Sequence, residues 1–324
     1  MTSAPSPPRL VARLLVAAWL FAFLPSGASA QSAVRPTQVH VVLGVQPDGA
    51  ATDQWLALVR RRVTADAFDS IAALRVPLTA QHRAWESLIR ERADGWPAML
   101  PGVTWPYAPV PPPAHITVVL GNRGAEDAFT HDAVTIGFDL SALQRAYGDA
   151  AGPENRDRLD RFFRHEAVHL MQKGWWGRQP YATDTPLRAA LADMWSEGLG
   201  NRESLSGRWT PNNGTPSAAT ARALEVLGPR LVARLGALAC LAPGSAADAL
   251  LQDLSSGPFT EKWGALPVAL WLADDARADS TIVPRFVAEG PEGVWSLARR
   301  HLPPPLAAAL SEVERAAARC ARAR

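Results

Sequence analysis

The 324-residue chain is nearly balanced in charge, with 33 lysine and arginine residues against 31 aspartate and glutamate residues. Its first 30 residues have the pattern of a secretory signal peptide, in which Arg9 and Arg13 precede an apolar run over 14–24. Ala28-Ser29-Ala30 then supplies a small-residue cleavage site. Cleavage would leave 31 basic against 31 acidic residues. That balance, without a basic cluster, argues against nucleic acid or anionic lipid as a partner.

The signal pattern also predicts where the protein acts. Cleavage after Ala30 implies an exported protein, either periplasmic or extracellular, while an uncleaved N-terminal anchor is the alternative. Nothing later in the chain approaches the roughly 18 consecutive apolar residues of a membrane-spanning helix. We therefore expect no stable membrane insertion after signal cleavage.

The chain has two cysteines, Cys240 and Cys320, and both follow the signal. In an exported protein they can form a disulfide, which we favour over two buried free thiols. The bond would close a loop of about 80 residues, and this constraint on the unfolded chain is worth on the order of 4 kcal/mol.

The first half of the chain mixes strand and helix patterns. Runs of β-branched residues predict strands over 39–45, 116–121 and 133–140. Apolar residues at helical spacing predict helices over 52–74 and 80–93. The segment 97–113 is rich in proline, so we predict an extended or looped connector over the surface.

After Pro153 the sequence is almost wholly helical. Glycine and proline separate segments at 155–173, 186–204, 217–240, 245–254, 262–274, 281–289, 292–301 and 305–322. Strands followed by helices predict an α+β fold, with a small N-terminal mixed or antiparallel sheet packed on the helix 155–173 and an all-helical C-terminal part. The predicted organisation is a signal peptide over 1–30, an α+β core over 31–205 and a helical subdomain over 206–324.

The segment His165-Glu166-Ala167-Val168-His169 lies within the predicted helix 155–173, which we expect Asn155 to cap and Gly174 to end. Two histidines at positions i and i+4 share one helical face, so their imidazoles can converge on one metal ion. Glu166 projects beside them and can reach a water on the metal without binding the metal itself. The alternative is a helix with two partly buried structural histidines.

A third ligand is predicted on the next helix. Thr185-Pro186 is a helix-start pattern, and the helix that it opens carries Glu197 within Ser-Glu-Gly-Leu-Gly. Gly198 and Gly200 lower helix propensity, which indicates close approach of a neighbouring element. Three protein ligands with a fourth position left for water are typical of catalytic zinc.

HExxH followed by a glutamate in a Glu-Gly-Leu context resembles the gluzincin metallopeptidases, the thermolysin-like clan, and is most similar to the bacterial peptidase-MA-like group. The resemblance covers about 116–205 and rests on four residues. It implies that Glu166 is the general base and that Zn²⁺ is bound by three residues: His165, His169 and Glu197. It also implies that the strand 133–140 lies alongside the substrate cleft.

The sequence departs from this family at several positions. Gly200 stands where these motifs usually carry alanine, and Asn201 where thermolysin proper has aspartate. Asp193, one turn before Glu197, is a candidate to orient a ligand histidine from behind, an exposed aspartate being the alternative. The mechanism needs a donor for the developing oxyanion, usually tyrosine or histidine, and Tyr181 is the nearest candidate.

The expected activity is hydrolysis of a peptide bond in a peptide or protein substrate. Glu166 would take a proton from a zinc-bound water as it attacks, and would pass it to the leaving amine. Two alternatives stay open: a zinc amidase acting on cell-wall peptides, and a non-catalytic, zinc-stabilised binding protein.

Overall fold

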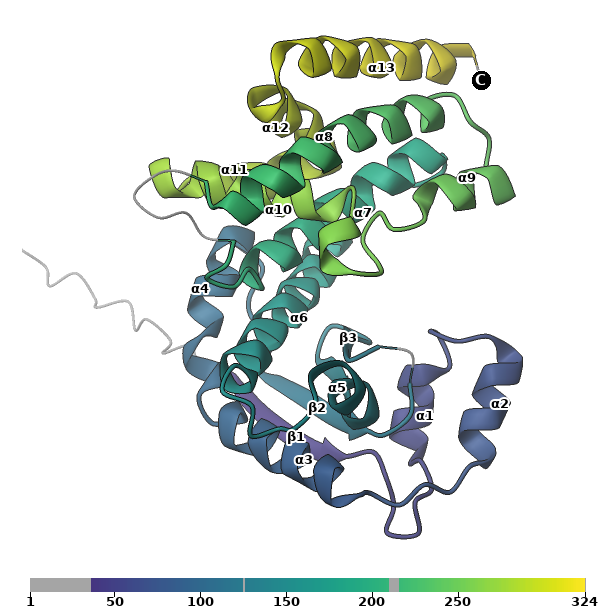
Figure 1. Cartoon of the computed structure of the whole chain (residues 1–324), viewed down its shortest axis with the longest axis vertical. Coiled ribbons are helices and arrows are strands. Elements are labelled where there is room, and N and C mark those ends of the chain that lie inside the picture. The colour runs from purple at the N-terminus through teal and green to yellow at the C-terminus, as the bar shows by residue number, and fades with distance from the viewer. Residues whose placement is uncertain (1–35, 125, 210–215, 324) are drawn as a thin grey trace, which may run out of the picture. The chain divides into compact units, whose positions relative to one another are not determined.

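The computed structural model describes residues 36–124, 126–209 and 216–323 (Figure 1). The predicted signal peptide therefore lies outside the described residues. Residues 36–324 form one compact unit, in which a small mixed sheet precedes a mostly helical part. The predicted α+β class is confirmed. Among the described helices, none is long and apolar enough to cross a membrane.

The sheet has four strands in the order β1-β2-β4-β3. The first three of these run parallel, and the edge strand β3 is antiparallel to β4. The strands are β1 (Gln38–Leu43), β2 (His115–Gly121), β3 (Ala128–Thr130) and β4 (Thr135–Asp139). The three predicted strands are confirmed. The additional strand β3 has only three residues, too few for its sequence to show alternation.

Both faces of the sheet are covered. Successive side chains of β2 point to opposite faces, so Val118 joins the main core and Val119 joins a smaller cluster on the other side. On the main face, Trp96 stacks on Phe163 and on Phe138 of β4, with ring centroids 4.4 and 6.1 Å apart. Because Phe163 belongs to the motif-bearing helix, this stacking fixes that helix against the sheet.

The single helix predicted over 52–74 is wrong. The segment forms two helices, α1 (Asp53–Val59) and α2 (Ala65–Ala73). Thr64 makes the break, because its side chain accepts a hydrogen bond from the Ala67 amide and caps α2. Two longer helices follow in this half, α3 (Ala80–Ala93), as the sequence predicts, and α5 (Leu140–Tyr147), which the sequence analysis does not predict.

The proline-rich segment is not a surface connector, which corrects the prediction for 97–113. Its first part contains three short helical turns, η1 (Trp96–Ala98), α4 (Leu100–Thr104) and η2 (Trp105–Tyr107). Each turn has a proline at one of its first two positions, where the missing N–H has no partner to lose. Leu100, Val103 and Tyr107 are buried, so the segment contributes to the core.

The predicted helices after Pro153 are confirmed with adjusted ends. They are α6 (Asn155–Arg178), α7 (Pro186–Glu203), α8 (Ala218–Leu238), α9 (Ser245–Leu251), α10 (Ala265–Ala278), α11 (Ile282–Glu289), α12 (Gly293–His301) and α13 (Pro304–Ala323). α6 does not end at Gly174, where an added Cβ would lie 2.8 Å from Val110 Cγ1, so this glycine allows close packing instead. Glu154 rather than Asn155 occupies the N-cap, and the Asn155 side chain donates to the Asp149 carbonyl.

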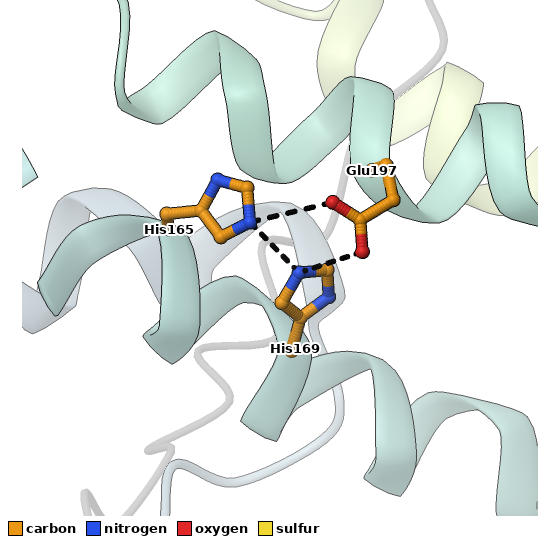
Figure 2. Close-up of side chains that lie close together, drawn as sticks. All are labelled: His165, His169 and Glu197. Carbon is orange, nitrogen blue, oxygen red and sulfur yellow. Dashed lines mark hydrogen bonds and ion pairs between the residues drawn. The ribbon is translucent and has the colours of Figure 1, made fainter. Parts of the chain in front are cut away.

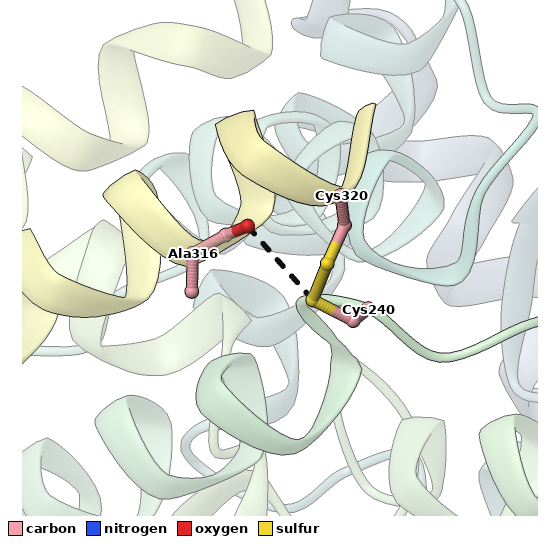
Figure 3. The surroundings of a disulfide bond; sticks show 3 residues. All are labelled: Cys240, Ala316 and Cys320. Carbon is pink, nitrogen blue, oxygen red and sulfur yellow. Dashed lines mark hydrogen bonds between the residues drawn. A yellow bond between two sulfur atoms is a disulfide. The ribbon is translucent and has the colours of Figure 1, made fainter. Parts of the chain in front are cut away.

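Helices from both sides of residue 205 pack together, since α10 lies against α7. The predicted division at that residue stays a prediction. Figure 3 shows the disulfide between Cys240, just after α8, and Cys320 of α13, which confirms the favoured pairing.

Candidate metal centre

Helices α6 and α7 pack against each other and bring the predicted ligands together. Thr185 caps α7 by accepting from the Arg188 amide, with a proline in the first turn, as the sequence predicts. Gly200 makes the close approach to α6, because a Cβ there would lie 2.9 Å from His165 Cε1. Gly198 makes the same kind of approach to α10, where a Cβ would lie 2.3 Å from Val268 Cγ1.

Three candidate ligand side chains, His165, His169 and Glu197, face a common point (Figure 2). His165 Nε2 and His169 Nε2 are 3.0 Å apart. Glu197 Oε2 lies 3.4 Å from His165 Nε2, and Glu197 Oε1 lies 3.3 Å from His169 Nε2. Two atoms bound tetrahedrally to zinc at about 2.0–2.1 Å are about 3.3 Å from each other. The arrangement therefore fits a zinc ion and leaves a fourth direction for water or substrate.

The tautomer of His169 is set by Gln172, which the sequence did not single out. His169 Nδ1 lies 2.7 Å from Gln172 Oε1. The amide orientation is fixed, because Gln172 Nε2 donates to the Ser196 carbonyl at 2.9 Å and Oε1 accepts from Ser196 Oγ at 2.7 Å. His169 Nδ1 must therefore carry the proton, which leaves the Nε2 lone pair for a metal.

Asp193, expected behind a ligand histidine, makes a different contact. Its Oδ2 accepts a hydrogen bond from Ser255 Oγ at 2.8 Å, and Gln172 holds the position expected for it. Burial and, after it, the charge of Glu197 raise the pKa of Asp193 to about 6. Asp193 therefore contributes negative charge behind Glu197 rather than a bond to a ring.

The ligands are strongly coupled electrostatically. Burial raises the pKa of Glu197, but the charges of His169 and His165 outweigh it and lower that pKa to about 2. Burial lowers the pKa of His165, and the hydrogen bond to Glu197 together with the charge of Glu166 reverses this and raises it. The negative charge of Glu197 therefore favours a cation at this point.

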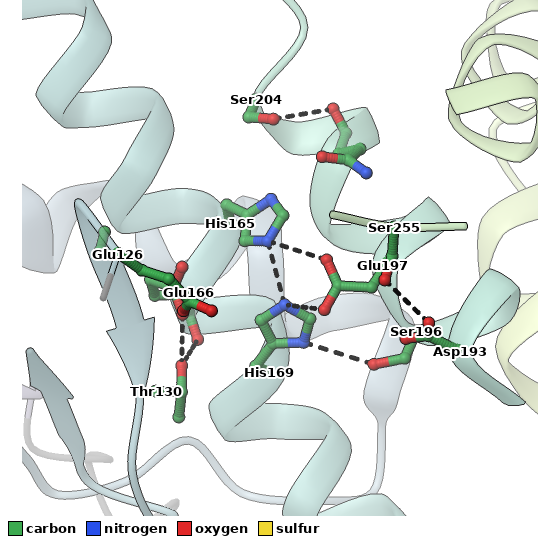
Figure 4. A network of polar contacts seen from close by, with 12 residues as sticks. Glu126, Thr130, His165, Glu166, His169, Asp193, Ser196, Glu197, Ser204 and Ser255 are labelled. Atoms are coloured by element: carbon green, nitrogen blue, oxygen red, sulfur yellow. Dashed lines mark hydrogen bonds and ion pairs between the residues drawn. The ribbon is translucent and has the colours of Figure 1, made fainter. Parts of the chain in front are cut away.

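Glu166 lies beside the ligands and is held by the sheet edge (Figure 4). Its side chain is 6 % exposed, and its Oε2 accepts a hydrogen bond from Thr130 Oγ1 at 2.7 Å. Thr130 is the last residue of β3. The strand next to the centre is therefore β3 and not the predicted 133–140, because β3 covers that edge of β4.

The four motif residues line one cleft of about 790 Å³, between β3 and the loop 252–262 that precedes α10. Tyr181 is not among the residues lining it. Its ring packs on Trp195 with centroids 6.0 Å apart, and an added Cβ on Gly290 would meet its hydroxyl. The structure thus places Tyr181 away from the substrate space. Lys173 and Lys262, the only two lysines in the sequence, both line the cleft.

A second group of potential ligands among the described residues comprises Asp274, Asp275 and His301. Asp275 contacts His301 Nε2 and Arg300 at 2.8 Å each, and Asp274 pairs with Arg277. These oxygens are satisfied by side chains between α10 and α12, so we assign no metal to this group.

Comparison of the chain with protein-family models, with curated proteins and with solved structures finds no match. The likeness to gluzincins therefore rests on the motif residues and their geometry. Gln172 had a sequence signal, since position i+3 from His169 lies on the same helical face. Thr130 had none, because its place depends on how β3 packs on α6.

Proposed function

We propose that the protein is an exported, zinc-dependent peptidase of the gluzincin type. The observation that carries this proposal is the convergence of His165 Nε2, His169 Nε2 and the Glu197 carboxylate, with Glu166 beside them in an open cleft. Bound zinc supplies Lewis-acid chemistry at this point, acidifying water and polarising a carbonyl oxygen.

Glu166 is the general base in this proposal. Thr130 occupies its Oε2, so Oε1 is the oxygen that takes a proton from the attacking water. Glu166 then passes that proton to the nitrogen of the leaving amine. Gln172 acts through His169, whose ring it holds in one tautomer.

A peptide is the substrate that best suits the surroundings of the centre. β3 is the last strand of the sheet, and an extended peptide can pair with the backbone of such an edge strand. The cleft is also large enough for several residues of an extended chain. Both features support a peptide or protein substrate, with the scissile bond over the three ligands.

Export is supported by two independent features. The N-terminal pattern is that of a cleaved signal. The Cys240–Cys320 disulfide suits an oxidising compartment such as the periplasm or the extracellular space.

The test combines zinc analysis with hydrolysis of fluorescence-quenched peptides by the mature protein, residues 31–324. Glu166→Gln should bind zinc like the wild type and lose on the order of 10²- to 10⁴-fold in kcat, because only the proton acceptor is removed. Glu225→Gln, an exposed change on α8, is the matched control and should leave zinc binding and kcat unchanged.

Each of the other outcomes would refute part of the proposal. A wild type without zinc excludes the metal centre, and a Glu166→Gln variant of full activity excludes the base. Zinc with no hydrolysis of any peptide would favour the binding protein, and cleavage restricted to cell-wall peptides would favour the amidase.

A further inference from the structure

Peptide hydrolysis puts negative charge on the substrate's carbonyl oxygen, and a donor in the protein must stabilise it. Tyrosine and histidine commonly do this. Among the described residues that line the cleft there is no tyrosine, and the histidines are the two ligands. A donor among the lining side chains would therefore be of another type.

Four cationic side chains line the cleft: Arg62, Arg145, Lys173 and Lys262. Arg62 forms an ion pair with Glu126. Lys173 is half-buried and donates to a backbone carbonyl at 2.8 Å. Arg145 is exposed on α5, in the wall formed by the sheet. Lys262 is the one of these four that comes from the opposite wall, formed by the loop 252–262.

The backbone beside Lys262 is firmly held. Trp263 is fully buried, its amide donates to the Asp253 carbonyl at 2.9 Å, and its indole N–H donates to the Gln252 carbonyl at 2.9 Å. The Lys262 ammonium lies 5.6 Å from the centre of the Phe259 ring. Within the described part of the chain, this ammonium makes no hydrogen bond or ion pair, so its N–H donors are available to a ligand.

Lys262 lines the same cleft as Glu197 and belongs to the loop that also carries Ser255. Figure 4 shows Ser255, from the same loop, on the Glu197 side, with Glu166 and Thr130 on the other. A carbonyl held over the ligands would therefore lie between β3, which holds the base, and the loop that carries Lys262.

We propose that Lys262 is a catalytic residue whose ammonium donates a hydrogen bond to the substrate's carbonyl oxygen as negative charge develops there. The proposal rests on the peptidase function. The water oxygen bonds to the carbonyl carbon, its proton goes to Glu166, and the π-electron pair moves onto the oxygen that Lys262 contacts. When that pair re-forms the carbonyl, the C–N bond breaks and the proton on Glu166 moves to the leaving nitrogen. Lys262 keeps its own proton throughout.

The first experiment separates charge from shape. Lys262→Met keeps the apolar stem, and it should lower kcat by about 10²- to 10³-fold with KM within about threefold of wild type. Lys173→Met is the matched control, because the ammonium it removes is already bonded, and it should keep kcat within about tenfold. Zinc content and thermal midpoint should stay at wild-type values in both.

Chemical rescue gives a readout that a structural role would not move. Both native cysteines are disulfide-bonded, so Lys262→Cys introduces the sole free thiol. Aminoethylation of that thiol restores an ammonium at nearly the original length, and should recover at least roughly a tenth of the wild-type kcat. A reagent of similar size that leaves a sulfonate on the thiol should recover none of the lost kcat. The wild type treated with either reagent should keep its kcat.

A second readout does not depend on turnover. With two lysines in the chain, amine labelling followed by mass spectrometry reports each one separately. In Glu166→Gln, a saturating peptide substrate should slow labelling of Lys262 several-fold and leave Lys173 unchanged. Equal labelling of Lys262 with and without peptide would count against contact with the substrate.

The results also separate the two proposals. An active wild type whose Lys262→Met variant keeps its kcat overturns the role of Lys262 alone. The role of Lys262 is also overturned if Lys262→Met raises KM for peptides with a free C-terminus but not for C-terminally amidated peptides. In that case Lys262 would bind the terminal carboxylate of the substrate. A wild type without zinc or hydrolysis overturns the peptidase function and this role with it.

Discussion

Replacing Gln172 by methionine would remove the acceptor that fixes the His169 tautomer while nearly keeping the side chain's length and volume. Gln172 belongs to α6 and is 2 % exposed, and its side chain contacts the Ser196 backbone of α7. Without its Oε1, the Nδ1 proton of His169 keeps only the longer contact to Ser196 Oγ at 3.4 Å, so the proton can shift to Nε2 and the ring can turn. Both changes oppose metal binding at Nε2.

The magnitude follows from the contacts that are lost. The substitution breaks the 2.7 Å contact to His169 Nδ1 and the bonds to Ser196 Oγ and the Ser196 carbonyl. Removing such a partner of a ligand histidine typically weakens metal affinity by about 10- to 100-fold, or about 1.4–2.7 kcal/mol. The metal-free protein loses on the order of 1 kcal/mol per hydrogen bond as well.

Competition with a chromophoric chelator measures the zinc affinity, and urea unfolding of the metal-free protein measures the stability. Ser196→Ala is the control, since it removes the hydroxyl but leaves the carbonyl that orients the Gln172 amide; it should weaken zinc binding by less than about threefold. If Gln172→Met binds zinc as tightly as the wild type, the assignment of the tautomer to this contact is wrong.

Three further predictions concern other contacts. Gly200→Ala should weaken zinc binding by about tenfold in the same competition, because its Cβ would displace the His165 ring; unchanged affinity would contradict the close approach. Burial raises the pKa of Asp193 to about 6, so ionised Asp193 destabilises the metal-free fold. Asp193→Asn should therefore raise the unfolding free energy at pH 8 by about 1–3 kcal/mol, and urea titrations should show this gain vanish as the pH falls from about 6 to 4. Replacing both residues of the Cys240–Cys320 bond with alanine should lower the unfolding free energy by about 2–4 kcal/mol and leave the zinc affinity unchanged.

Local errors in the sequence interpretation have a common physical cause. From the sequence alone, proline and glycine predict breaks at 97–113 and at Gly174. In the structure, the prolines stand in the first turns of short helices, and Gly174 makes room for Val110 within a continuous helix. A residue that disfavours a helix in isolation is tolerated where packing against another element outweighs its propensity.

The sequence by itself determined which helical face carries the candidate metal ligands. His165 and His169 point the same way because they stand four residues apart on a helix, and this holds whatever packs around them. It also indicated that Glu197 would join them, since Gly200 marks a helix that approaches another closely. The α+β class followed from the order of strand and helix patterns along the chain.

Only the tertiary structure decided what surrounds that face. Thr130, Ser196 and Lys262 line the cleft from a three-residue edge strand, a neighbouring helix and a loop far along the chain, while Tyr181 packs elsewhere. No local pattern encodes these positions, because each depends on the packing of elements distant in sequence. The helix period defines the ligands, and the packing of β3, α7 and the loop 252–262 around α6 defines the cleft in which they could act.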